Sequence, residues 1–199
     1  MSTIAEATKL LTADEFYEFV HRPENANKWL ELVRGEVIEL ASPTKPHGFL
    51  CANVARLMGN YTYQRNKGYV TSNDTGVIVE RDPDTVRGPD VALYEDANVI
   101  EEIHPKYGET SPLVAVEVLS PEDRASLVFR KIAEFLKSGV RMVWIVDLER
   151  RTVTVHRPDK PQVVVEAEQE LTGDDVLPGF SCKVSDIFRL PGDKRPPTP

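Results

Sequence analysis

Two carboxylates and one amine stand out in the sequence because each begins or interrupts an otherwise apolar element. Glu117 lies inside the run 113–119, which is rich in β-branched residues and typical of a strand buried on both faces. Asp90 begins a predicted strand, and Lys131 interrupts the apolar stripe of a predicted helix. A bare carboxylate in a dry strand is destabilising unless it is protonated, paired or bound to a cation. Glu117 therefore needs a partner.

The three residues could together perform metal-dependent hydrolysis. Two carboxylates on adjoining strands repel each other unless a divalent cation lies between them, and oxygen ligands alone suit Mg²⁺ or Mn²⁺ better than zinc. Such a cation polarises a phosphoryl oxygen and lowers the pKa of bound water. The Lys131 ammonium would orient that water or stabilise the developing charge. We therefore predict a catalytic site of Asp90, Glu117 and Lys131, in which Asp90 and Glu117 bind the metal.

Each of these residues also has an ordinary structural explanation. Asp90 suits a turn, and the stem of Lys131 could pack along the apolar helix face. Glu117 and Lys131 could instead form a metal-free ion pair. Two further candidates stay open: Glu31 is either a third carboxylate or an exposed hairpin residue, and His47 either contacts a phosphate or is a surface histidine.

Composition limits the class of protein. A chain of 199 residues with 41% hydrophobic content suits one domain over residues 1–190, followed by a tail at 191–199 that we expect to be disordered because it holds four prolines. The net charge of −8 argues against a generally basic surface that coats nucleic acid, although not against a local basic groove.

The sequence lacks the signals of a membrane or secreted protein. It contains neither an apolar stretch of about 20 residues nor a basic and apolar leader, so we expect no membrane partner and a cytoplasmic location. Cys51 and Cys182 lack CxxC spacing, and we predict that both are reduced packing residues rather than zinc ligands.

Periodicity predicts the elements that hold the candidate residues. Thr12 and Glu15 form a capping box for a short helix, and 29–40 is typical of a β-hairpin. A helix follows and ends near Gly68. Short strands are predicted at 69–71, 76–80 and 90–94, with loops at 81–89 and 98–111.

The second half of the chain predicts a βαβ unit. Strand 113–119 leads into a helix capped by Ser120 and ended by Gly139, and strand 142–147 should pair with it in parallel. The remaining elements are a hairpin of 152–156 with 162–166 and a short docking segment at 176–188.

Several motifs, taken together, resemble the Uma-type restriction endonuclease family. They are Arg87-Gly88-Pro89-Asp90-Val91, Val116-Glu117-Val118-Leu119-Ser120-Pro121, Arg130-Lys131, Gly139-Val140 and Val143-Trp144-Ile145-Val146-Asp147. The likeness covers roughly residues 11–188, including Glu31, His47 and the closing Leu177-Pro178-Gly179-Phe180. No single motif is specific, but the set is.

The resemblance implies the fold of the PD-(D/E)XK nuclease superfamily. We therefore predict an α/β chain of α+β-like character, with a restriction-endonuclease-like mixed central β-sheet flanked by helices and with β-hairpins at the edges. The resemblance also implies that Asp90 and Glu117 are the metal-binding carboxylates. One position departs from the superfamily motif, which has lysine where this chain has Leu119. The family pattern suggests that Lys131 on the following helix replaces it.

These observations predict a Mg²⁺- or Mn²⁺-dependent endonuclease that hydrolyses nucleic acid, with DNA as the expected substrate and a homodimer as the expected state. The alternative is a catalytically inactive nuclease-fold module that binds nucleic acid or protein. The acidic net charge and Leu119 favour this alternative. A third hypothesis makes Glu117 and Lys131 a structural pair in a protein whose role is protein association.

Overall fold

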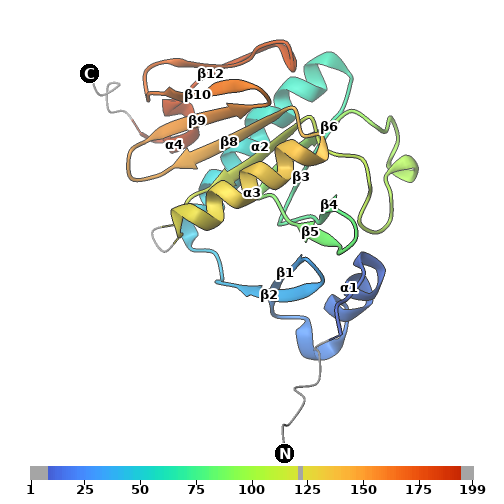
Figure 1. The fold of residues 1–199 in the computed structure, drawn as a ribbon. Helices are drawn as coiled ribbons and strands as arrows, with labels where there is room; N and C mark the ends of the chain where they lie inside the picture. Colours follow the sequence, from blue (N-terminus) through green and yellow to red (C-terminus); the bar gives the residue numbers. More distant parts are fainter. Residues whose placement is uncertain (1–8, 121–122, 194–199) are drawn as a thin grey trace, which may run out of the picture.

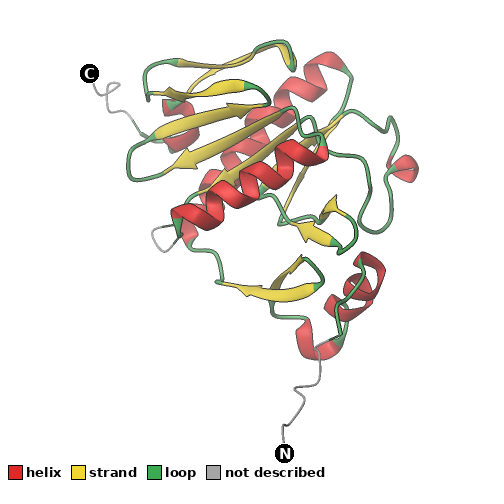
Figure 2. Cartoon of the chain, viewed as in Figure 1, coloured by secondary structure: helices red, strands yellow, loops and turns green. Residues whose placement is uncertain are grey.

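The computed structural model describes residues 9–120 and 123–193 (Figures 1 and 2). The α-helices of this part of the chain are α1 (Ala13–Val20), α2 (Lys45–Arg65), α3 (Ala125–Ser138) and α4 (Ser185–Phe188). Short 3-10 helices lie at Pro23–Asn25 and Ile100–Glu102. The strands are β1 (Trp29–Val33), β2 (Glu36–Leu40), β3 (Tyr69–Ser72), β4 (Val77–Glu80), β5 (Thr85–Arg87), β6 (Val91–Tyr94), β7 (Val114–Val118), β8 (Met142–Asp147), β9 (Thr152–Arg157), β10 (Lys160–Val165), β11 (Glu170–Gly173) and β12 (Leu177–Lys183).

A mixed six-stranded sheet forms the centre of the molecule, as predicted. Its strand order is β10-β9-β8-β7-β6-β3, and β7 pairs with β8 in parallel while the other neighbours are antiparallel. The parallel pair is the predicted βαβ unit, since α3 connects its two strands. A second sheet has the order β2-β1-β5-β4, and β11 pairs with β12 in a third.

Helices cover both faces of the central sheet (Figure 1). Alternation along β7 directs Val114, Val116 and Val118 into an apolar cluster shared with α2, α4 and β12, and directs Ala115 into a second cluster shared with α3. Glu117 follows the same alternation onto the α3 side. The alternation of side chains along this buried strand therefore directs its one carboxylate toward α3, the helix that carries Lys131.

Local signals account for most of the boundaries. The predicted capping box at Thr12 and Glu15 begins α1. The β1–β2 hairpin turns at Arg34 and Gly35, which both have positive φ, as a type I′ turn requires. Helix α2 ends at Arg65, where Asn66 takes a left-handed conformation, slightly earlier than predicted.

Three predictions about elements are wrong. The expected loop 81–89 contains β5, which joins β1 to β4. The docking segment 176–188 is instead β12 and α4, and β12 forms an unpredicted hairpin with β11. Helix α3 begins at Ala125 with Arg124 as its N-cap, so Ser120 does not cap it. The Ser120 N–H instead donates to the Asp123 carboxylate.

The structure does not describe every residue on which the sequence analysis draws. Pro121 and residues 194–199 of the proline-rich tail lie outside the described residues. Within the described residues, none of the helices combines the length and apolar character needed to cross a membrane.

Candidate active site

Asp90 and Glu117 come together at one end of the central sheet. Strands β6 and β7 are antiparallel with Val91 opposite Val116, so Asp90 stands next in line opposite Glu117. The backbone N–H of Val118 donates to Asp90 Oδ2 at 2.6 Å. This hydrogen bond orients the Asp90 carboxylate, which is 11% exposed, and joins the ends of the two strands.

Glu117 has one oxygen paired and one free of hydrogen bonds. Its Oε2 lies 2.8 Å from Lys131 Nζ, whereas Oε1 is buried with no hydrogen-bond partner among the described residues. Burial raises the pKa of Glu117 to about 8, and the charges of Asp90 and Glu31 add to this rise while Lys131 opposes it. A buried carboxylate oxygen without a donor has an unmet requirement that a cation would satisfy.

Lys131 lies among three oxygen atoms. Its Nζ contacts Glu117 Oε2 at 2.8 Å, Glu31 Oε1 at 3.0 Å and the Gly88 carbonyl oxygen at 3.0 Å. Although burial lowers it, Glu117 and Glu31 hold the pKa of Lys131 above its usual range. The three acceptors match the three N–H donors of an ammonium group, so the amine is held in one orientation.

Glu31 is buried beside Lys131, so the alternative of an exposed hairpin residue is wrong. It is 3% exposed, accepts the Gly88 N–H at 3.0 Å and pairs with Arg87 Nη1 at 2.7 Å. Although burial raises it, Lys131 and Arg87 together lower the pKa of Glu31. Glu31 is therefore held as a carboxylate by two cations and one backbone donor.

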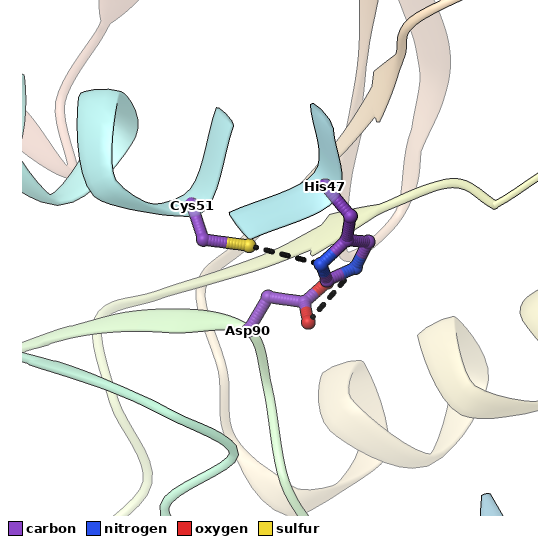
Figure 3. Close-up of side chains that lie close together, drawn as sticks. All are labelled: His47, Cys51 and Asp90. Atoms are coloured by element: carbon purple, nitrogen blue, oxygen red, sulfur yellow. Dashed lines mark hydrogen bonds and ion pairs between the residues drawn. The ribbon is translucent and has the colours of Figure 1, made fainter. Parts of the chain in front are cut away.

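His47 lies on the other side of Asp90, and the alternative of an ordinary surface histidine is wrong. Its side chain is 14% exposed, and Nε2 lies 3.3 Å from Asp90 Oδ1 (Figure 3). Its Nδ1 lies 3.4 Å from Cys51 Sγ. The hydrogen bond with Asp90, followed by that with Cys51, raises the pKa of His47 to about 10.

The prediction that Cys51 is a reduced packing residue rather than a zinc ligand stays a prediction, but the structure gives this cysteine neighbours that could bind a metal ion with it. Cys51 follows His47 by four residues, a spacing that brings both side chains to one face of α2. Ligand atoms of His47, Cys51 and Asp90 all lie within 4.8 Å of one another. Cys182 has no such neighbours in the described chain, and it packs against the apolar cluster beneath α2.

Several residues that were not among the predicted candidates lie around Glu31, Lys131 and Asp90. Arg87 is 10% exposed and joins Glu31 to Glu134 of α3, with Nε 2.7 Å from Glu134 Oε2. A Cβ on Gly88 would lie 2.5 Å from the Asp74 carbonyl oxygen, so the backbone can approach there only without a side chain. Burial, with the charge of Asp90, raises the pKa of Asp74 to about 6. The Arg-Gly-Pro-Asp run was the available signal for Arg87 and Gly88.

The donor set fits a small oxygen-preferring cation. Asp90 and Glu117 present carboxylate oxygens at the same end of the sheet, and Glu117 Oε1 lacks another partner in the described residues. Carboxylate oxygen atoms are the protein ligands that Mg²⁺ and Mn²⁺ prefer. Asp90 and Glu117 could therefore hold such an ion, with Lys131 fixed beside them.

Comparisons with known proteins point to nucleases. The model of the Uma2 family, described as "Putative restriction endonuclease", matches residues 13–185. A crystal structure of a "putative nuclease belonging to DUF820" from Anabaena variabilis ATCC 29413 is similar in fold, with a TM-score of 0.75 and 21% identity. The match covers 89% of this chain and 97% of that one. The search of curated proteins found no match.

Proposed function

Because the chain belongs to the Uma2 family of restriction-endonuclease-like proteins, we propose that it is a Mg²⁺- or Mn²⁺-dependent endonuclease that hydrolyses phosphodiester bonds in DNA. The observation that carries this proposal is the buried Glu117 Oε1, which lacks a hydrogen-bond partner in the described chain beside a second carboxylate, Asp90. A structural ion pair would use Glu117 Oε2 alone and leave Oε1 unexplained. A shared divalent cation accounts for both oxygens.

In this proposal Asp90 and Glu117 hold the cation. The metal, when bound, polarises a phosphoryl oxygen and makes its bound water more acidic. The Val118 N–H keeps Asp90 oriented, and the Val118 carbonyl is a candidate additional ligand. Glu31 and Arg87 fix the position of Lys131 and the shape of the site.

Lys131 is the residue proposed to act on the reacting water or on the developing charge. All three of its N–H donors have protein acceptors in the structure. Contact with a water or a phosphoryl oxygen therefore requires one of these acceptors to turn away. Glu117 is the acceptor most suited to this change, because a bound cation would compete with the ammonium for its oxygens.

The start of α3 offers basic side chains for the phosphate backbone. Arg124 is exposed, and Arg130 is 45% exposed although its Nε pairs with Glu134 at 2.9 Å. Arg124 is the N-cap of the helix that carries Lys131, and Arg130 lies in that helix, so a nucleic-acid backbone bound along the helix would pass the site.

We also propose a homodimer, because two sites are needed to cut both strands at once. Sedimentation as a monomer at micromolar concentration would contradict it.

The decisive experiment compares cleavage by wild type and Glu117→Gln. Plasmid DNA and single-stranded RNA are incubated with Mg²⁺, with Mn²⁺ or with a chelator. We expect wild type to nick or linearise DNA only when metal is present and Glu117→Gln to lose both metal binding and cleavage. Glu149→Gln is the matched control, since Glu149 is exposed in the β8–β9 turn. Cleavage that survives in a folded Glu117→Gln protein would overturn the site.

A second candidate is a binding module that keeps the nuclease fold without cleavage. It is favoured by Leu119 at the motif lysine position and by the full set of acceptors around Lys131. Fluorescence anisotropy with labelled DNA separates the two functions. Saturable binding without cleavage in either metal would support the module.

A further inference from the structure

The α2 side of Asp90 carries a donor set of a different kind from the Glu117 side. His47 and Cys51 extend from the first turns of α2 toward Asp90, with the imidazole ring between the thiol and the carboxylate (Figure 3). His47 Nδ1 lies 3.4 Å from Cys51 Sγ, and Nε2 lies 3.3 Å from Asp90 Oδ1. Two ligands at positions i and i+4 of a helix are a recurrent arrangement for binding one metal ion.

The types of donor atom select the class of metal. A thiolate, an imidazole and a carboxylate are zinc ligands, and the sulfur is a poor ligand for Mg²⁺. Bond lengths of 2.0–2.3 Å around zinc place tetrahedral ligand atoms about 3.5 Å apart. One ion can take only one ring nitrogen of His47, so the imidazole must give up its contact with either Cys51 or Asp90. With one ligand atom from each residue, the three atoms lie within 4.8 Å of one another, so side-chain rotations that move them by about 1 Å would bring them to a shared ion.

The surroundings also suit a cation. Cys51 is partly buried, and the side chains of His47 and Asp90 are 14% and 11% exposed, so the donors are shielded without being sealed. Asp74 lies near enough for its charge to act on Cys51, His47 and Asp90. A metal would replace the protons on the thiol and the imidazole, since both must be deprotonated to bind it.

We propose that His47, Cys51 and Asp90 form a binding site for a zinc-type transition-metal ion, which inhibits the chain by taking Asp90 away from the Mg²⁺ site. The binding half of this proposal stands on the His47-Cys51-Asp90 geometry alone. The inhibitory half rests on the proposed endonuclease function, because it requires a Mg²⁺-dependent reaction to inhibit. Three protein ligands leave a fourth position for water or for a substrate oxygen.

The test of binding uses Co²⁺ as a spectroscopic substitute for zinc. Metal-free wild type, Cys51→Ser and Cys182→Ser are titrated with Co²⁺, and thiolate-to-cobalt charge transfer is followed by absorbance. We expect the band in wild type and Cys182→Ser, its loss in Cys51→Ser, and displacement of Co²⁺ by Zn²⁺. Cys182 is the matched control because it is also a partly buried free cysteine. Absence of the band in wild type, or its persistence in Cys51→Ser, would overturn the site.

Two more variants separate this site from the proposed Mg²⁺ site. His47→Gln should weaken Co²⁺ binding by about 10²-fold or more, since losing a ligand costs more than losing an outer hydrogen bond. Glu117→Gln should keep the charge-transfer band, because Glu117 is not a ligand here, even though it should lose Mg²⁺. If both variants behave alike, the two sites are not distinct and the proposal fails.

Zinc sensitivity tests the inhibitory half. Cleavage with Mg²⁺ is measured with and without Zn²⁺, and the ratio is compared between proteins. We expect Zn²⁺ to inhibit wild type and Cys182→Ser strongly and Cys51→Ser at least about tenfold less. Equal inhibition of all three would refute the mechanism through Cys51. If no protein cleaves DNA at all, the endonuclease function fails, while the cobalt band still decides the binding site.

Discussion

Two buried aspartates, Asp84 and Asp90, lie before and after β5 in the chain and make the same kind of hydrogen bond in different surroundings. Each accepts a backbone N–H from a distant element, Asp84 Oδ2 from Ala13 at 2.7 Å and Asp90 Oδ2 from Val118 at 2.6 Å. Asp84 Oδ2 also forms an ion pair with Arg81 Nη1 at 2.9 Å. Asp90 instead faces His47 and lies near Glu117, whose Oε1 has no partner in the described residues.

The difference shows what distinguishes a structural carboxylate from a candidate catalytic one. Burial and a backbone donor are common to both, so neither is diagnostic. Asp84 satisfies the N–H of Ala13 in the first turn of α1 and is neutralised by one arginine, and all of its interactions are local to that corner. Asp90 belongs to a group with Glu117 and Glu31, in which one buried carboxylate oxygen, Glu117 Oε1, has no hydrogen-bond partner among the described residues. Such a group is costly unless a ligand completes it.

The largest expected effect comes from Asp90→Asn. The amide oxygen can still accept the Val118 N–H, so the fold should persist, but the charge that binds metal is lost. Cleavage should fall by about 10³-fold, and calorimetry should detect weaker binding of both Mg²⁺ and Co²⁺. Asp84→Asn is the control and should retain cleavage in the folded protein. Equal loss of activity in both variants would remove the distinction between the two aspartates.

Lys131→Met should have the next largest effect. Methionine fills a similar volume on the apolar face of α3 while removing the ammonium, and cleavage should fall by about 10²-fold. Without metal, the buried Glu117 and Glu31 lose their shared partner, which should cost about 3 kcal/mol of unfolding free energy. Thermal melts should show that Mg²⁺ stabilises this variant more than wild type, because the ion replaces a missing charge.

The control for this experiment is Lys137→Met, which removes a 74% exposed ammonium from the same helix. It should change neither cleavage nor the response to Mg²⁺. An unchanged cleavage rate in a well-folded Lys131→Met protein would exclude the mechanism in which this lysine replaces the one missing at Leu119. In that case the structural ion pair remains as the explanation of Lys131.

Asp84→Ala should have a smaller effect than the two variants above, and this effect concerns stability alone. The variant leaves the buried Ala13 N–H without its acceptor, which should cost about 2 kcal/mol of unfolding free energy. Asp175→Ala, which removes a 69% exposed partner of Arg141, should cost about 0.5 kcal/mol or less. Chemical denaturation of both variants measures these differences.

The pH dependence of the Asp84 effect has a definite sign. Although burial raises it, the Ala13 N–H and Arg81 hold the pKa of Asp84 below its ordinary value of 3.8. A carboxylate whose pKa is lower in the folded state stabilises the fold fully above the ordinary value, and it loses this contribution as the pH falls through the folded pKa. The difference in unfolding free energy between wild type and Asp84→Ala should therefore be largest above about pH 3.8 and should narrow as the pH falls from there through the folded-state pKa of Asp84. A gap independent of pH would show that the charge of Asp84 plays no part.

Local patterns in the sequence were sufficient for most of the fold. The capping box at Thr12, the turn at Arg34-Gly35 and the βαβ spacing each depend on residues close together in the chain, and each is found in the structure. The apolar run around Glu117 identified the residue that needs a partner. Strand β5 escaped prediction because three residues carry little periodicity, and its strand geometry depends on pairing with β1 and β4.

The sequence by itself determined which side chains are out of place, and only the tertiary structure decided what they meet. From the sequence alone, Glu31 could have been an exposed hairpin residue. In the structure, β1 pairs with β5 and α3 packs nearby, and these contacts enclose Glu31 with Arg87 and Lys131. The sequence shows that His47 and Cys51 are four residues apart. It does not show that both lie close to Asp90, because that proximity depends on how α2 packs against β6. Helical and strand periodicities arise within a few residues, whereas these contacts join segments that only the assembled sheets and helices bring together.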